Sequence, residues 1–349
     1  MSDRYHTLDA MRGIAALAVV ALHIGHVMRL DTLQHAYLAV DFFFMLSGFV
    51  LARAYEAKLK TSLSLIKFIE IRVVRLYPLF LLGVLFGGVK IIGQIVGQSA
   101  NAMSPAQAAI NFVLNALMLP GTDGQGNLFP LNMPAWSLFL ELVINLAFGL
   151  FLFRMKSWQL LLVTFVSGAF YFLELMEFGR GGFGSLWNTI GLGFLRVLYA
   201  FPLGILFARA LTAGSQLSWA SIAILGIFGG VLGLSAPALP AWTIDAVGVF
   251  VALPLLLWGG AKFQLPQAFN KIGNFLGNIS YPLYAVHMPL LQIAMFVFVT
   301  NFGLPPRAIA TFFFLSVVFV SWILAKFDAR VRASISRALV LRRSAMPQT

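Results

Sequence analysis

Apolar residues along this chain form long, uninterrupted stretches, and polar residues are concentrated in the segments between them. A helix needs about 20 predominantly apolar residues to cross the hydrocarbon core of a bilayer. The stretches that meet this requirement lie at roughly 8–28, 37–53, 76–96, 134–153, 158–176, 186–209, 217–235, 242–261, 273–299 and 307–326. The pattern therefore predicts an all-α, polytopic membrane protein with about ten transmembrane helices.

A further apolar stretch, at 104–119, is too short to be read as a span and contains Asn111 and Asn115. Ser104 followed by proline is typical of a helix start, because the first helical position needs no N–H partner. We predict an interfacial or re-entrant helix here, followed by a flexible glycine-rich loop at 121–127.

Basic residues are distributed unequally between the two sets of loops. Eighteen of the 24 Lys and Arg residues fall on one side of the predicted spans, and only three fall in the opposite loops. Because cytoplasmic loops carry an excess of Lys and Arg, both termini are predicted to be cytoplasmic. We expect one integral membrane domain over residues 1–349, without an attached soluble domain, in the inner (cytoplasmic) membrane.

Composition narrows the class further. The chain has 349 residues, of which 60% are hydrophobic and 10% charged, and its net charge is +12. Soluble proteins carry about 25% charged residues, and disordered chains need low hydrophobicity. A nucleic-acid partner is not expected, because a basic binding surface needs a polar face. There is no cysteine, so a disulfide, a thiolate metal site and a cysteine nucleophile are excluded.

Ionisable side chains inside the spans are costly and so mark candidate functional positions. In the first span Asp9 and Arg12 are three residues apart, so they share a helix face and can pair. His23 lies on the same side of the helix, about 16 Å beyond Arg12. A lone histidine can also be a packing or hydrogen-bonding residue between helices, so this pattern alone leaves its role open.

Glu141 lies about seven residues, roughly 10 Å, inside the outer end of the fourth span. His23 lies at a similar predicted depth, so the two could form an acid–base pair. Asp41, early in the second span, competes with Glu141 as the partner of His23. A purely structural ion pair would have the same sequence pattern.

Arg72 and Arg75 project from one helix face at the inner end of the third span. Two guanidinium groups in this position suit phosphate groups, and anchoring to anionic lipid head groups is the alternative. Arg196, in the middle of the sixth span, has no evident partner in the sequence. We expect it to face an anion or a water-filled cavity.

The ninth span begins with an unusually polar segment around Pro282, which frees a backbone carbonyl. Tyr281, Tyr284 and His287 could line a cavity from the cytoplasmic side. An aromatic belt on a kinked helix is the alternative interpretation.

Five segments of the chain resemble motifs of the membrane-bound acyltransferase-3 family, which includes bacterial O-acetyltransferases of surface polysaccharides. In family order they are Leu8–Ala16 followed by His23, Asp41–Phe49, Arg72–Pro78, Trp136–Leu138 with Glu141, and Ile279–Tyr281 through His287. The Arg-to-His spacing, Phe-Phe-x-x-Ser-Gly and Trp-Ser-Leu-x-x-Glu carry most of the specificity. One departure is visible: Leu142–Asn145 replaces an aromatic pair often found after the glutamate, which could mark a different acceptor.

The resemblance implies transfer of an acyl group, most simply acetyl, from cytoplasmic acyl-CoA to a hydroxyl on the outer face. The acceptor would be a carbohydrate, with a glycolipid or secondary metabolite as the alternative. His23 would act as general base or transient acyl carrier, and Glu141 or Asp41 would orient it. The donor-binding residues would be Arg12, Arg72, Arg75, Tyr281 and His287. Acetyl-CoA would be a substrate rather than a resident cofactor, membrane lipids would surround the protein, and no metal is expected.

Two other classes of function are compatible with the spans. A secondary transporter would show inverted halves with paired broken helices, and none is evident in the sequence. A non-catalytic membrane sensor or scaffold would need none of the intramembrane charges for chemistry.

Overall fold

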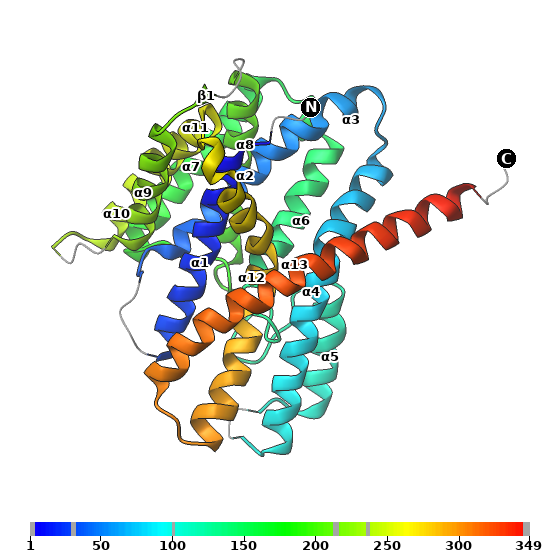
Figure 1. The fold of residues 1–349 in the computed structure, drawn as a ribbon, viewed down its shortest axis with the longest axis vertical. Coiled ribbons are helices and arrows are strands. Elements are labelled where there is room, and N and C mark those ends of the chain that lie inside the picture. Colours follow the sequence, from blue (N-terminus) through cyan, green and yellow to red (C-terminus); the bar gives the residue numbers. More distant parts are fainter. Residues whose placement is uncertain (1–3, 29–32, 100–101, 212–215, 235–237, 345–349) are drawn as a thin grey trace.

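The computed structural model describes residues 4–28, 33–99, 102–211, 216–234 and 238–344, and it is almost entirely helical (Figure 1). The helices are α1 (His6–Met28), α2 (Ala39–Leu51), α3 (Ala57–Thr61), α4 (Leu65–Val96), α5 (Pro105–Ala116), α6 (Ala135–Leu150), α7 (Ser157–Phe178), α8 (Ile190–Ala210), α9 (Ala220–Gly233), α10 (Ala241–Val247), α11 (Leu253–Lys262), α12 (Asn270–Ala294) and α13 (Pro306–Ser344). The strands of the described residues, β1 (Gln216–Leu217) and β2 (Phe263–Gln264), form one short parallel pair.

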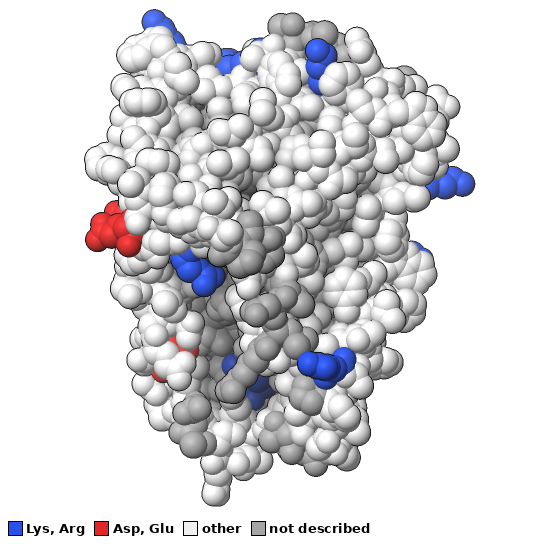
Figure 2. All heavy atoms as spheres, turned by 90° about the vertical axis from the view of Figure 1, so that its left-hand side faces the viewer, with Lys and Arg blue, Asp and Glu red and all other residues white. Residues whose placement is uncertain are grey.

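Within these described segments, eight helices are long and apolar enough to cross a membrane. Two shorter apolar helices, α6 and α9, correspond to the fourth and seventh predicted spans. The fold class predicted from the sequence is therefore confirmed: the protein is an all-α, multi-pass membrane protein. Bulky apolar side chains on its outside, such as Phe165 at 71% exposure, are typical of a lipid-facing surface. The face in Figure 2 accordingly carries few charged side chains.

Several helices extend beyond the apolar stretches that predicted them. A π-helical turn at Ala52–Glu56 joins α2 to α3, and α4 begins eleven residues before the predicted span at 76–96. Lys, Arg, Leu and Glu are good helix formers in water, so a helix can continue past the bilayer where hydropathy no longer marks it. In Figure 1 the start of α1, helix α3 and the start of α4 lie at the upper end, where the charge bias places the cytoplasm.

Helices α1 and α12 approach each other closely along a seam of small residues. A Cβ added at Gly13 would lie 2.4 Å from Cβ of Leu276, and one at Gly277 would lie 2.8 Å from Cβ of Asp9. Small residues allow helix backbones to come together in lipid, where packing rather than hydrophobicity drives association. This seam places the polar residues of α1 directly against those of α12.

The stretch at 104–119 forms the short helix α5 rather than a span, as predicted. The Ser104 side chain accepts a hydrogen bond from the Gln107 backbone, which forms the first half of a capping box. Asn111 is buried, and Thr122 in the following loop satisfies its side-chain amide. The amide nitrogen donates to the Thr122 carbonyl, and the amide oxygen accepts from the Thr122 backbone N–H. Asp123 in turn accepts backbone hydrogen bonds within that loop, which gives the glycine-rich segment a defined turn.

Candidate active site

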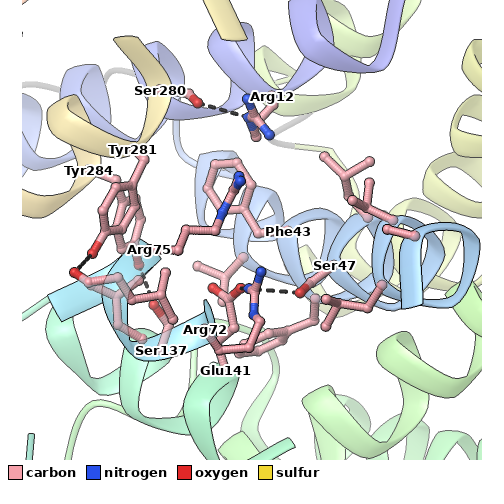
Figure 3. A pocket seen from close by; sticks show the side chains of 18 of the residues that line it. Arg12, Phe43, Ser47, Arg72, Arg75, Ser137, Glu141, Ser280, Tyr281 and Tyr284 are labelled. Atoms are coloured by element: carbon pink, nitrogen blue, oxygen red, sulfur yellow. Dashed lines mark hydrogen bonds and ion pairs between the residues drawn. The ribbon is translucent and has the colours of Figure 1, made fainter. Parts of the chain in front are cut away.

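A cavity of about 300 Å³ lies among α1, α2, α4, α6 and α12 (Figure 3). Its walls are mostly apolar, with charged groups from three helices. We call it the arginine cavity, after its three lining arginines, Arg12, Arg72 and Arg75. Glu141 is its acidic residue, and all four were singled out from the sequence. The structure thus brings together candidates separated by more than one hundred residues in the chain.

Arg72 and Glu141 form an ion pair in the wall of this cavity. Nη2 of Arg72 lies 3.2 Å from Oε1 of Glu141, and the Ser47 hydroxyl donates to the same oxygen at 3.1 Å. Among the residues that the structure describes, Nε of Arg72 has no hydrogen-bond partner although it is buried. A buried guanidinium N–H without an acceptor is costly, so this donor is available for a ligand.

Arg12 is held at the seam between α1 and α12. It pairs with Asp9 at 3.1 Å, which confirms the pair predicted from their spacing. Its Nε donates to the Ser280 hydroxyl at 2.9 Å and its Nη2 to the Gly277 carbonyl at 2.8 Å. These bonds fix the guanidinium at the mouth shared by two cavities.

The second cavity, of about 820 Å³, shares a wall with the first that includes Arg12, Arg75 and Tyr281. We call it the basic vestibule. Its cationic lining residues are Arg4, Arg12, Arg75, Lys271, Lys326 and Arg332, and its acidic ones are Asp9 and Asp328. Its residues come from α1, α2, α4, α12 and the middle of α13.

Among the residues that the structure describes, the polar side-chain partner of His23 is another histidine rather than a carboxylate. Nδ1 of His23 lies 2.8 Å from Nε2 of His287, and the two ring planes are nearly parallel, with centroids 5.0 Å apart and an interplanar angle of 22°. His23 is partly exposed, whereas His287 is fully buried. Neither lines the arginine cavity, but the Tyr284 ring, which does, lies 6.0 Å from the His287 ring. The cavity therefore ends one aromatic ring away from the histidine pair.

The predicted partnership of His23 with Glu141 or Asp41 is wrong. Glu141 points into the arginine cavity toward Arg72. Asp41 instead pairs with Arg196, through two contacts of 3.0 and 2.7 Å. Depth along the membrane was estimated from the sequence, but the direction in which each helix face points was not, and direction decides these contacts.

The expectation for Arg196 is corrected by the same contact. Its partner is Asp41 rather than a free anion or a water-filled cavity, and its remaining donors reach the carbonyls of Phe183 and Tyr37. Both members of the ion pair have no exposed side-chain surface. Their position makes them a structural link between α2 and α8.

The predicted cavity role of the α12 tyrosines fits their positions. Tyr281 and Tyr284 both line the arginine cavity, and the Tyr281 hydroxyl donates to the Leu76 carbonyl. Tyr284 shares a hydrogen bond of 2.6 Å with the Ser137 hydroxyl. From the sequence, Ser47 and Ser137 were recognised only as parts of longer motifs and not as site residues. Their polarity inside apolar runs was the signal that could have identified them as site residues.

No group of three or more potential metal ligands comes together in the described ranges of the chain. The polar chemistry available at the site is therefore that of guanidinium, carboxylate, hydroxyl and imidazole groups. Arg12 and His23 lie on α1, Arg72 and Arg75 on α4, and His287 on α12. Guanidinium groups can bind an anion, and imidazole groups can transfer a proton.

These features define a multi-pass membrane protein with a basic entrance and a buried polar centre. A family described as acyltransferase domain matches residues 5–326, and the chain therefore belongs to the acyltransferase-3 family.

Curated relatives agree with this assignment. The chain is 36% identical over 187 residues to "Protein 2 in picA locus" of Rhizobium radiobacter, which covers 50% of this chain and 97% of that protein. It is 26% identical over 322 residues to acyltransferase MdmB of Streptomyces mycarofaciens, in an alignment that covers 83% of this chain and 79% of that protein. It is also 26% identical over 260 residues to exopolysaccharide production protein ExoZ of Rhizobium meliloti, in an alignment that covers 71% of this chain and 74% of that protein. No solved structure matches the chain significantly.

Proposed function

We propose that this acyltransferase moves an acyl group, in the simplest case acetyl, from cytoplasmic acyl-CoA to an acceptor hydroxyl on the opposite face of the inner membrane. The observation that carries the proposal is a cavity lined by three arginines, of which Arg72 has a buried Nε without a hydrogen-bond partner among the described residues. Such a donor calls for an oxygen-rich ligand. The family supplies the reaction type.

The two cavities suit the two halves of an acyl-CoA molecule. Its nucleotide half carries three phosphate groups, which match the excess of cations in the basic vestibule. Its thioester arm is long, thin and largely uncharged, which matches the smaller, mostly apolar arginine cavity. In this arrangement Arg12 and Arg75 contact the molecule where its phosphates give way to the arm. Arg72 Nε then donates to a carbonyl oxygen of the arm.

The reaction we assign to His23 is general-base catalysis. The acceptor oxygen attacks the thioester carbonyl carbon while Nε2 of His23 takes the hydroxyl proton. The carbon–sulfur bond then breaks, and the leaving thiolate takes that proton from the imidazolium. The products are an ester and free CoA thiol. An acyl-histidine intermediate is the alternative, in which Nε2 first displaces the thiolate and the acceptor hydroxyl then displaces the imidazole.

For the thioester to reach His23, the aromatic end of the arginine cavity has to open. Phe43 and Tyr284 stand there edge to face, with ring centroids 5.6 Å apart. Phe43 is partly buried and Tyr284 is buried, so both rings have to turn before the arm can pass. We propose that these two rings separate the donor arm from the outer half of the protein until the arm passes between them.

A carbohydrate is the acceptor class we favour. Support comes from one relative, which is named as an exopolysaccharide production protein. A glycolipid or a secondary metabolite is the second candidate. A hydroxyl of either class would approach His23 from its partly exposed side.

The direct test uses the full-length protein in lipid vesicles, with labelled acetyl-CoA added from either side and glycans supplied on the other. We expect CoA release and labelled ester only when acetyl-CoA reaches the end that carries the basic vestibule. Mass analysis of surface glycans from cells with and without the gene identifies the acceptor. A folded protein that neither binds acetyl-CoA nor releases CoA would contradict the proposal and favour transport.

A further inference from the structure

We infer that His287 is a positioning residue that fixes the proton of His23 on Nδ1 and leaves Nε2 as the reactive nitrogen. This inference rests on the proposed function of His23, because it names the group that orients the base. The carboxylates expected for that task are engaged elsewhere, Glu141 with Arg72 and Asp41 with Arg196.

The backbone of α12 determines the tautomer of His287. Nδ1 of His287 lies 2.9 Å from the carbonyl oxygen of Leu283 and 3.0 Å from that of Tyr284. Carbonyl oxygens only accept hydrogen bonds, so this ring nitrogen carries a hydrogen. The helix itself therefore determines which nitrogen of His287 is protonated.

The second step follows from the chemistry of a neutral imidazole. With its hydrogen on Nδ1, His287 has a lone pair on Nε2, which can only accept. The 2.8 Å contact with Nδ1 of His23 is therefore a bond that His23 donates. The opposite direction would need a cationic His287. That charge would be fully buried, and its polar contacts in the described part of the chain are His23 and two carbonyls, so no carboxylate compensates it.

Nε2 is the reactive nitrogen of the His23 ring. A His23 that keeps its hydrogen on Nδ1 has its lone pair on Nε2, directed away from His287. In hydrolases of the Ser-His-Asp type a carboxylate holds the imidazole in this same tautomer. Here a second imidazole does so, and α12 holds it in place. When Nε2 of His23 takes a proton, the hydrogen on Nδ1 remains bonded to His287 and the positive charge is shared through that bond.

The packing of α1 against α12 keeps the two rings in register. Gly13 and Gly277 allow the close approach of the helices on the donor side of the pair. His287 itself has no exposed surface. A buried ring that is bonded at both nitrogens has little freedom to rotate.

Nuclear magnetic resonance tests the tautomer without any turnover. The full-length protein, labelled with ¹⁵N at its five histidines, is reconstituted in lipid nanodiscs at neutral pH. Signals are assigned with the His23→Gln and His287→Gln variants. We expect both rings to be protonated on Nδ1, and we expect His23 to lose this preference in His287→Leu. A wild-type His23 protonated on Nε2 would overturn the inference even if the enzyme is active.

Kinetics test the positioning role. His287→Leu removes the acceptor, so we expect kcat to fall by about 10²–10⁴-fold while the KM for acetyl-CoA changes by less than about threefold. His287→Gln can place an amide oxygen near the lost Nε2, and we expect it to restore kcat to within about tenfold of wild type. Equal losses in the two variants, or an effect confined to KM, would contradict a positioning role.

The matched control is His6→Leu. His6 also bridges α1 to α12, through a 3.0 Å contact with Asn274 at the other end of the helix pair, and it is partly buried. We expect its kcat to stay near the wild-type value. If wild-type protein transfers no acetyl group at all, the proposed function fails, while the tautomer measurement still decides the inference about His287.

Discussion

Asp41 and Arg196 form a bidentate ion pair that joins α2 to α8 and has no exposed side-chain surface. Burying two charges costs several kcal/mol per ion, and the pair is tolerated because both carboxylate oxygens and the guanidinium are bonded. The pair stabilises one arrangement of the two helices, which approach each other closely about two turns farther along, at Gly48 and Gly204.

Removing one member of this pair leaves the other as an uncompensated buried charge. We expect Asp41→Leu or Arg196→Met alone to lower the free energy of unfolding by about 3–5 kcal/mol. The double variant should lose less than either single variant. Chemical unfolding of the purified protein in detergent measures this. Additive losses in the double variant would show that the two residues act independently.

Arg72→Lys tests the donor cavity. Lysine keeps the positive charge but has no planar fork, so it cannot both pair with Glu141 and donate to a ligand through an Nε group. We expect the KM for acetyl-CoA to rise about tenfold or more, with a well-folded protein.

The control for this change is Arg154→Ala, because Arg154 is exposed and its contacts are local, with the Leu150 carbonyl and the Phe153 ring. Its KM should match wild type. An unchanged KM in Arg72→Lys would remove Arg72 from the donor site.

Gly13→Ala tests the seam between α1 and α12. The new Cβ would lie 2.4 Å from Cβ of Leu276, so one helix has to move. We expect a loss of about 1–3 kcal/mol in stability and a lower kcat, because the histidine pair depends on this approach.

Gly226→Ala on α9 is the matched change, since an added Cβ there meets nothing within 4 Å. It should leave activity unaltered and stability unchanged or raised by about 0.5–1 kcal/mol. A harmless Gly13→Ala would mean that the two helices can separate without consequence.

Phe43→Ala tests the aromatic end of the arginine cavity. Removing this ring should let longer acyl groups pass, and one methylene in an apolar pocket changes specificity by about tenfold or more. We expect kcat/KM for butyryl-CoA relative to acetyl-CoA to rise by at least about tenfold. Phe165→Ala, on a lipid-facing surface, is the control. An unchanged preference would place the acyl group elsewhere.

The sequence correctly predicted the features that depend on a single helix. The spans follow from hydropathy, and the contact between Asp9 and Arg12 follows from a spacing of three residues. The partners of His23 and Arg196 lie 264 and 155 residues away. Hydropathy and spacing give a residue's depth and its face on its own helix, but they do not give the rotation of that helix against its neighbours. This is why His23 was given the wrong partner, whereas the grouping of the three arginines came from the family resemblance.

The separation of Asp41 from Arg196 along the chain also has a consequence for synthesis. The chain grows at about 5–20 residues per second, so the 155 residues between them take roughly 8–30 s to make. During that interval α2 enters the membrane before its counter-ion exists. Asp41 lies in the first turn of α2, and an unpaired aspartate opposes insertion by up to about 3 kcal/mol, the value for the centre of a span. We expect α2 and α8 to complete their packing together, once Arg196 is available to pair with Asp41.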